Sequence, residues 1–432
     1  MPPGPGDGQE PTVVRGRVRA VLAEPNFRLY LAGQGLSLVG TWMQAVAQPW
    51  LVLQLSHSGT VLGLSTAALF LPVLLLGPYG GLVADRAHKR RLLFLTQAAF
   101  LLLALGLGVL TVTGAVRLWQ VFVIALLMGV VNAVDTPTRQ TFVPELVGRA
   151  LIRDAVSVNS VMVSATRAIG PGVAGVVIAV AGAGVCFLVN AASFVAVLAS
   201  LALMRAGRLR PTPPVAREPG QVREGLRYVR GQMGLWAPLL MLAVVGTLAY
   251  EFQVVLPLLA VDDLHGDSRT YGYMTSAMAL GAVAGGLAVT LRGRAGVLPL
   301  TCAAAGFGLA ILAASLVPTL TAELVALPFV GAAGTFFLAT VSTTLQMTSQ
   351  PRFRGRVMAL WSVMFMGSTP VGGPVVGAVA DVLGARVALG LGALACALAT
   401  VVGLLVLPRL PPDRRVLPHI VPEEDEPGAG RR

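Results

Sequence analysis

The sequence has few charged residues for its length. Lys, Arg, Asp and Glu make up 12% of the 432 residues, hydrophobic residues make up 55%, and the mean hydropathy is +0.76. Soluble domains carry roughly 25% charged residues. The composition therefore excludes an ordinary soluble domain. Because apolar runs of membrane-spanning length recur along the chain, it predicts an all-α polytopic membrane protein.

Residues that build metal, redox and nucleotide sites are scarce. Each of the three cysteines (Cys186, Cys302 and Cys396) stands alone in an apolar segment, so neither a disulfide framework nor a metal site is expected. The only lysine, Lys89, lies outside the G-x-x-x-x-G-K-[ST] loop that an ATP site needs. The catalytic patterns G-x-S-x-G and H-E-x-x-H are absent. We expect a protein that is not an enzyme and uses neither a cofactor nor ATP.

A net charge of +12 can indicate a nucleic-acid partner. Here the bases cluster between the apolar runs, as the positive-inside rule describes, so we expect a lipid bilayer and no nucleic acid. The first 28 residues lack the apolar core and cleavage site of a removable signal peptide. We interpret residues 1–28 as a cytoplasmic N-terminal segment.

Twelve apolar segments, each near the ~20 residues that cross a bilayer, follow one another along the chain. We number them as spans 1 to 12. Their expected bounds are 29–53, 61–83, 92–113, 118–143, 156–181, 184–204, 236–260, 272–291, 297–317, 320–345, 357–382 and 385–407.

The positions of Lys and Arg predict the orientation. With the N-terminus in the cytoplasm, 28 of the 32 Lys and Arg residues fall on the cytoplasmic side. Arg117, Arg269 and Arg386 then face outward, and Arg167 lies inside span 5. This bias predicts that both termini are cytoplasmic. We expect a multi-pass protein of the bacterial inner membrane, and a monomer.

The loop 205–235 divides the chain into two six-span halves, 29–204 and 236–407, and residues 408–432 are expected to form a disordered cytoplasmic tail. The stretch RPTPPVAREPG is a Pro-rich linker. The stretch VREGLRYVRGQM predicts an amphipathic helix on the cytoplasmic membrane surface, with a solvated connector as the alternative. Its apolar face comprises Val222, Leu226, Val229 and Met233, and its basic face comprises Arg223, Arg227 and Arg230.

The two halves resemble each other in sequence. GRALIRDAV before span 5 is similar to FRGRVMALW before span 11, and Gly170 and Gly175 match Gly372 and Gly377 at the same offset. Parallel six-span repeats around a central cavity are typical of transporters. The pattern predicts twelve transmembrane helices in two six-helix pseudo-repeats.

The stretch GLVADRAHKR, residues 81–90, resembles the major facilitator superfamily signature between spans 2 and 3, G-x-x-x-D-R/K-x-G-R/K-R/K. The residues around span 1 (FRLYLAGQGLSLVGTWMQAVAQPWLVL) and GPGVAG in span 5 resemble the drug-efflux branch that contains the enterobactin exporter. The resemblance covers about residues 25–408. It implies the major facilitator fold and transport by alternating access.

By this resemblance, Asp85 would lie near the start of span 11, close to Arg356 and Val357, and latch the halves in the outward-facing state. Arg86 and Arg90 would reach Asp135. The implied conformational gate comprises Gly81, Asp85, Arg86, Lys89, Arg90, Asp135 and Arg139. This chain departs from the pattern twice, because His88 replaces a glycine and Thr290 replaces the aspartate in the second half.

Two carboxylates at membrane depth are candidates for proton coupling. Glu251 lies in the apolar stretch LAYEFQVVLP of span 7, where an unpaired carboxylate must pair, take up a proton or face water. A structural bond to a neighbouring helix is the alternative. Asp135 is four residues before Arg139 in span 4, which permits an ion pair on one helix face. We expect a gate role for this pair, with proton relay as the minor option.

A polar stripe in span 1 predicts a water-filled substrate cavity, because lipid-facing amides would be unsatisfied; hydrogen bonding between helices is the alternative. The stripe comprises Gln34, Ser37, Thr41, Gln44 and Gln48. Arg167 shares a face of span 5 with three serines, and either an anionic substrate or a structural ion pair is expected there. Weaker cavity candidates, also readable as ordinary packing residues, are Asn132, Asn159, Tyr250, Gln253, Trp361 and Met364.

The span 5 stretch GPGVAG resembles a motif found in antiporters, with Ala174 in place of a glycine. Gly170, Pro171 and Gly175 permit close helix packing, and we expect span 8 to supply the partner surface through Gly281, Gly285 and Gly286.

These observations favour a secondary transporter that exports a small hydrophobic or amphipathic compound, such as a drug, siderophore or secondary metabolite, in exchange for protons. Solute uptake by the same fold is the alternative. A membrane receptor or secretion accessory that transports nothing is a further one.

Overall fold

The computed structural model describes residues 19–148, 151–210, 221–292, 295–411 and 415–417. These residues form helices joined by short turns, with one isolated β-bridge between Ala295 and Leu417. The N-terminal half contains α2 (Pro25–Ser56), α3 (Gly59–Arg86), α4 (Lys89–Val112), α5 (Leu118–Val147), α6 (Ile152–Ala181) and α7 (Ala183–Leu203).

The C-terminal half follows a linker helix, α8 (Gln221–Arg230). Two of its membrane segments are built from more than one helix. Its elements are α9 (Met233–Ala249), α10 (Phe252–Leu258), the π-helical turn η3 (Leu259–Asp263), α11 (Ser268–Arg292), α12 (Val297–Leu316), α13 (Leu320–Thr348), α14 (Arg354–Met366), α15 (Thr369–Leu383) and α16 (Ala385–Val406).

Eleven of the described helical segments are long and apolar enough to cross a membrane, counting α9 to η3 as one and α14 with α15 as one. The remaining long helix, α2, has 32 residues and a polar stripe that lowers its hydropathy. It packs along α6 and α7 within the same bundle. With α2 the protein is a bundle of twelve membrane helices, as the sequence predicts.

The same helix pairs form the core of each half. In the N-terminal half α2 and α4 pack on α7, and α3 packs on α5. In the C-terminal half α9 and α12 pack on α16, and α11 packs on α13. Counted by span, these are the pairs 1–6, 3–6 and 2–4 and their equivalents 7–12, 9–12 and 8–10. The predicted pseudo-repeat is therefore confirmed.

Matching glycines make the sharp turns in the two halves. Gly182 separates α6 from α7, and Gly384 separates α15 from α16. Both have positive φ, 84° and 91°, which strains any residue with a Cβ atom. The one-residue connections hold spans 5 and 6, and spans 11 and 12, as antiparallel neighbours.

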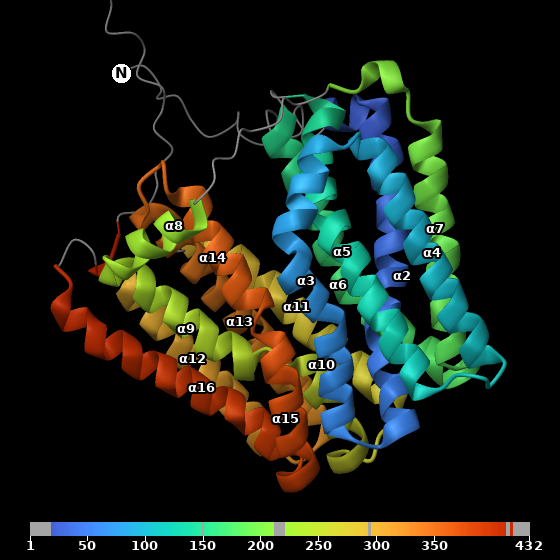
Figure 1. The fold of residues 1–432 in the computed structure, drawn as a ribbon. Coiled ribbons are helices and arrows are strands. Elements are labelled where there is room, and N and C mark those ends of the chain that lie inside the picture. The colour runs from blue at the N-terminus through green and yellow to red at the C-terminus, as the bar shows by residue number, and fades with distance from the viewer. Residues whose placement is uncertain (1–18, 149–150, 211–220, 293–294, 412–414, 418–432) are drawn as a thin grey trace, which may run out of the picture.

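The two halves meet at one end of the molecule. We call the end where α2 begins and α16 ends the terminal face, and the other end the opposite face. Figure 1 shows the two bundles converging at the opposite face, at the bottom of the view, and diverging towards the terminal face. The main contacts between them are α3 with α15 and α6 with α11.

Glycines bring α3 and α15 into backbone contact. Gly59 lies against Gly377, and Gly63 lies against Gly373, so that a Cβ atom added at Gly63 or Gly377 would collide with the carbonyl oxygen of its partner. Such small residues allow membrane helices to pack at close range. This contact joins the halves near the opposite face.

The linker helix α8 lies against the C-terminal half. Val229 is buried, the rings of Tyr228 and Phe353 stack with centroids 4.1 Å apart, and Glu224 pairs with Arg356 at 2.6 Å. Residues 211–220 of the linker lie outside the described residues. The placement of α8 on a membrane surface stays a prediction.

The beginning of the C-terminal tail is ordered where it is described. The backbone N–H of Leu417 donates to the carbonyl oxygen of Ala295 at 2.8 Å, and Leu410 is buried. This differs from the disordered tail expected over 408–432, because the chain folds back onto the turn before α12. The N-terminal residues 1–18 and the tail residues 412–414 and 418–432 lie outside the described residues.

Gly63→Ala is expected to lower the midpoint of thermal unfolding in detergent, because the added methyl group pushes α3 away from α15. Gly77→Ala on the same helix is the matched control, since no atom lies within 4 Å of a Cβ added there. Alanine is favoured over glycine inside a helix by roughly 0.5–1 kcal/mol, so the control should be unchanged or slightly stabilised. Equal midpoints for the two variants would contradict the close contact.

Candidate functional site

Spans 7 and 11 are both interrupted near the middle of the membrane. Helix α9 ends at Ala249 and α10 begins at Phe252, and α14 ends at Met366 while α15 begins at Thr369. A Cβ atom added at Gly246 would lie 2.9 Å from Oγ of Ser368, so the two interruptions are adjacent. The sequence predicted continuous helices over 236–260 and 357–382. This correction matters because discontinuous helices mark binding sites in many transporters.

Glu251 lies in the interruption of span 7 and is 3% exposed. Its Oε1 atom has no hydrogen-bond partner among the described residues, and the Thr369 hydroxyl lies within hydrogen-bonding reach of the carboxyl group. Gly372 and Gly373 leave the space that it fills, since Cβ atoms added there would lie 2.9 and 3.5 Å from its oxygens. Glu251 therefore lies against the first turns of α15 without a charged partner.

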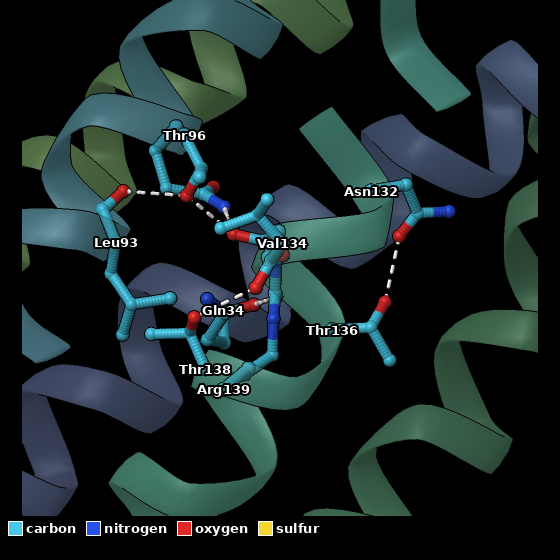
Figure 2. A network of polar contacts seen from close by, with 10 residues as sticks. Gln34, Leu93, Thr96, Asn132, Val134, Thr136, Thr138 and Arg139 are labelled. Carbon is cyan, nitrogen blue, oxygen red and sulfur yellow. Dashed lines mark hydrogen bonds and ion pairs between the residues drawn. The ribbon is translucent and has the colours of Figure 1, made fainter. Parts of the chain in front are cut away.

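Asp135 has a different environment, and three members of its hydrogen-bond network, Gln34, Thr96 and Arg139, are labelled in Figure 2. Its Oδ1 accepts hydrogen bonds from Thr96 Oγ1 at 2.7 Å and Gln97 Nε2 at 2.8 Å, and its Oδ2 is ion-paired with Arg139. Arg139 also donates to Oε1 of Gln34. The network ties α2, α4 and α5 together inside the N-terminal half. Both carboxylate oxygens of Asp135 have partners. This suits a structural pin, by which we mean a residue that holds α2, α4 and α5 together, better than a group that exchanges protons.

Four of the five residues in the span 1 stripe are buried: Gln34, Ser37, Gln44 and Gln48, with Thr41 exposed. Gln44 accepts from Asn190 Nδ2 of α7 at 2.6 Å and donates to Gln48 at 3.4 Å. Gln34 and Gln44 thus bond α2 to neighbouring helices, which is the alternative that the sequence left open. The burial of the four residues contradicts a water-filled face in this arrangement, and a role of the stripe in a substrate cavity stays a prediction.

The basic cluster after α3 is held inside the N-terminal half. Lys89 pairs with Glu145 at 2.5 Å, and Arg90 donates to the carbonyl oxygens of Leu201 and Ala202 at 2.8 and 3.0 Å. The predicted contact of Arg90 with Asp135 is therefore wrong, because Arg90 closes the end of α7 instead.

Other gate residues are less constrained. Gly81 and Arg86 belong to the last turns of α3, and Arg86 is exposed. The side chain of Asp85 lies outside the described part of the chain, and so does that of Thr290. Arg356, the expected neighbour of Asp85, is paired with Glu224 of α8.

An aspartate that the sequence did not single out joins the halves at the opposite face. Asp381, near the end of α15, accepts hydrogen bonds from the backbone N–H groups of Gly59 and Thr60 at 2.5 and 2.9 Å. It also accepts from the hydroxyls of Ser58 and Thr60 at 2.8 and 2.7 Å. A carboxylate at a helix N-terminus satisfies free N–H groups and opposes the helix dipole. Asp381 therefore caps α3 across the interface.

Two exposed faces run along α6. One is apolar, with Val161, Ile169 and Val180 each more than half exposed, and suits lipid. The other carries Ser157, Ser160 and Arg167, all exposed, and cannot face lipid without leaving charge unsatisfied. The guanidinium of Arg167 lies over the ring of Trp42, 5.3 Å from its centroid. The predicted structural ion pair is absent among the described residues.

Aromatic rings gather beside the interruption of span 7. Tyr250 packs edge-on against Phe365 at 5.4 Å, Trp361 stacks on Phe365 at 5.8 Å, and Tyr250 Oη donates to the carbonyl of Gly334 at 2.6 Å. Nε1 of Trp361 has no partner among the described residues. Tyr250 lies within electrostatic range of Arg167.

The other cavity candidates lie apart from this cluster or make only local contacts. Asn132 accepts a hydrogen bond from Thr136 one turn later on α5. Asn159, Gln253 and Met364 are half-buried.

The antiporter-like motif packs α6 against α11. Gly175 meets Gly272, and Ser268 Oγ donates to the Gly175 carbonyl at 3.2 Å, while Gly170 lies against Trp42. Pro171 contacts Gly272 through its carbonyl oxygen. The partner glycine in span 8 is therefore Gly272.

Gly281 and Gly285 were expected to pack against α6, but they lie against Pro328 and Ala332 of α13. They lie about 2.5 and 3.6 turns after Gly272 on α11, where this helix packs against α13 of its own half.

A second buried carboxylate also escaped the sequence interpretation. Glu323, in the first turn of α13, is fully buried and neither of its oxygens has a hydrogen-bond partner among the described residues. Arg386 and Asp263 lie within electrostatic range and pair with each other at 3.1 Å. The signal was available, because Glu323 is an isolated acid at the start of a predicted apolar span.

The family match and the relatives below place the chain among the major facilitator membrane transporters, which are not enzymes. Residues 18–418 match the family described as transmembrane secretion effector, and the chain belongs to that family.

Several characterised relatives are similar in sequence. The staphyloferrin A transporter of Staphylococcus aureus is 29% identical over 59% of this chain and 64% of its own length. The multidrug efflux pump Tap of Mycolicibacterium fortuitum is 28% identical over 82% of this chain and 87% of its own length. The enterobactin exporter EntS of Shigella boydii is 24% identical over 89% of this chain and 90% of its own length. The match thus covers less than two thirds of the staphyloferrin A transporter.

Solved structures share the fold. The occupied, inward-facing bacterial homologue of the human lysosomal transporter Spinster aligns with a TM-score of 0.70 at 15% identity, over 95% of this chain and 99% of that one. The nucleoside transporter NupG aligns with a TM-score of 0.71 at 12% identity, over 88% and 98%.

Asp135→Asn is expected to destabilise the protein by roughly 3 kcal/mol, because it removes the buried counter-charge of the half-buried Arg139. Thermal unfolding in detergent measures the loss. The double variant Asp135→Asn, Arg139→Gln should lose less than the two single variants together. Glu24→Gln is the control, since its partially exposed pair with Arg210 spans 3.4 Å and such pairs contribute about 0–1 kcal/mol. Equal losses for Asp135→Asn and Glu24→Gln would contradict the pin.

Proposed function

We propose that this protein is a proton-coupled exporter of a small hydrophobic or amphipathic compound and works by alternating access. The observation that carries the proposal is the position of Glu251. It is a buried carboxyl without a charged partner, at the paired interruptions of spans 7 and 11. A buried carboxylate without compensation is costly, so such a group changes its protonation readily when its surroundings change. Asp135 is the weaker candidate, because both of its oxygens are already engaged.

The contacts of α15 suggest how protonation of Glu251 changes the packing between the two halves. Gly373 lies beside both Glu251 and Gly63 of α3, since a Cβ atom added there would be 3.5 Å from the Glu251 carboxylate and 3.0 Å from the Gly63 carbonyl oxygen. Further along, Gly377 meets Gly59, and Asp381 caps α3. A change of charge at Glu251 alters the packing of the first turns of α15, and α15 is the helix that closes the opposite face. The two events therefore share one rigid element.

The positive-inside rule supports a cytoplasmic terminal face in a bacterial inner membrane. With that orientation, the contacts at the opposite face make this an inward-facing arrangement. Asp381 is then a latch that holds the outer side closed. The role of Asp85 as its cytoplasmic counterpart stays a prediction.

Relatives support export over uptake. Their names include a multidrug efflux pump, a macrolide efflux protein and an enterobactin exporter. Uptake by the same fold is the alternative, and it predicts that cells lacking the protein accumulate less substrate. A receptor that transports nothing predicts no flux in proteoliposomes.

Glu251→Gln is expected to lower the rate of transport driven by a pH gradient at least tenfold, while the substrate still binds. The glutamine fills the same space but carries no exchangeable proton. Sealed vesicles with an imposed pH gradient, screened with labelled drugs and siderophores, measure the rate. Glu323→Gln is the comparison, because it also removes a buried, unpartnered carboxyl. Normal coupling in Glu251→Gln together with loss in Glu323→Gln would move the proton site to α13.

Asp381→Asn is expected to open the opposite face by weakening the cap on α3. Spin labels at Val112 of α4 and Leu316 of α12, both exposed at this face, report the distance between the halves once the three cysteines are changed to serine. The distribution should gain a longer component in the variant.

The matched control is Asp267→Asn. Asp267 also caps a helix, accepting from the N–H groups of Arg269 and Thr270 at 2.9 and 3.2 Å, but within its own half. An unchanged distance for Asp381→Asn, or the same change for both variants, would overturn the latch.

A further inference from the structure

Arg167 is a cation at membrane depth whose charge no described group balances. It lies halfway along α6, about 22 Å from either end of the 30-residue helix at 1.5 Å per residue. No described carboxylate lies within 4.0 Å of its guanidinium, and the group over which it lies is the ring of Trp42. A charged residue inside a membrane protein pairs with another group or marks a ligand pathway. The exposure of Arg167 leaves it accessible to a ligand.

Two of the buried polar groups without a partner among the described residues are indole N–H groups, and one of them belongs to Trp42, whose ring lies under Arg167. The other belongs to Trp361. Glu251 Oε1 and Ser276 Oγ are the unpartnered oxygens of the same region. Indole N–H groups donate and cannot accept. A site that offers a guanidinium and unused N–H donors matches a ligand that brings hydrogen-bond acceptors and negative charge, because a planar oxyanion group accepts two parallel bonds from arginine.

Aromatic rings supply the other half of the recognition surface. Tyr250 lies within electrostatic range of Arg167, and its ring packs with Phe365 and, through it, Trp361. These rings come from α14 and the interruption of span 7, whereas Arg167 and Trp42 come from α6 and α2. A ligand that touches both sets bridges the two halves.

We propose that the substrate is an amphipathic anion, with an oxyanion group bound by Arg167 and an aromatic or apolar body against Tyr250, Trp361 and Phe365. The inference rests on the proposed transport function and narrows its substrate class. It predicts that neutral and cationic drugs of the same shape bind less well. Arg167 acts as a specificity-determining residue that touches the substrate.

The test compares 2-naphthoate with 2-naphthamide, which have the same shape and differ in charge. Isothermal titration calorimetry on the full chain in nanodiscs, without a pH gradient and with empty nanodiscs as the blank, measures both affinities. Wild type should bind naphthoate at least tenfold more tightly than naphthamide. Arg167→Gln should remove this preference by weakening naphthoate binding at least tenfold more than naphthamide binding, and Arg167→Lys should keep part of it.

Arg153→Gln is the matched control, because Arg153 is an exposed arginine on the same face of α6. It should retain the full preference. The inference is overturned if wild type shows no preference for naphthoate. It is also overturned if Arg167→Gln lowers the affinity for both ligands equally. The outcome is independent of export, since binding selectivity without gradient-driven flux would refute only the proposed function. Flux with unaltered selectivity in Arg167→Gln would refute only the anion site.

Discussion

Gly59 and Gly63 of α3 lie against Gly377 and Gly373 of α15, so the two halves of the protein touch through their backbones. Side chains can change rotamer to absorb a small movement, but backbone contacts cannot. The interface is therefore either closed or open, and packed interfaces of this kind switch between discrete arrangements. The capping of α3 by Asp381 adds a polar bond to the same contact. All other features of the inferred mechanism depend on this pair of helices.

Helix α15 contacts Glu251 at its first turns and the start of α3 at its last turn, and its length explains how it reaches both. Its 15 residues cover about 21 Å at 1.5 Å per residue, from Glu251 at mid-membrane to the N-terminus of α3. The interruption at Gly367 and Ser368 uncouples α15 from α14, and the interruption beside Glu251 uncouples α10 from α9. The outer parts of spans 7 and 11 can thus move separately from their inner parts. In span 11 the inner part, α14, is attached to the linker helix by the pair of Arg356 with Glu224.

Hydropathy predicted the twelve spans and the depth of Glu251, because these depend on transfer from water to lipid, and the similar sequences of the two halves predicted the repeat. The interruption of span 7 carries no glycine or proline where α9 ends, in LAYEF, and was therefore not predicted. The interruption of span 11 does carry a local signal, Gly367 followed by Pro370, which hydropathy alone does not register. Asp381 was missed, like the interruption of span 7, for lack of a local signal. In VADVLG it resembles any acid at a helix end, and its partners are more than 300 residues away in sequence.

Polar periodicity on α2 and on α6 corresponds to different environments, buried on α2 and exposed on α6, and residue chemistry explains the difference. A glutamine amide has two donors and an acceptor that its own helix cannot satisfy, so Gln34 and Gln44 are bonded to Arg139 and Asn190 on neighbouring helices. A serine hydroxyl can bond its own helix, as Ser160 does to the Val156 carbonyl. Serines therefore need no partner helix and can line an open face. On that face Arg167 is the only side chain with a charge that the helix cannot satisfy at membrane depth among the residues described.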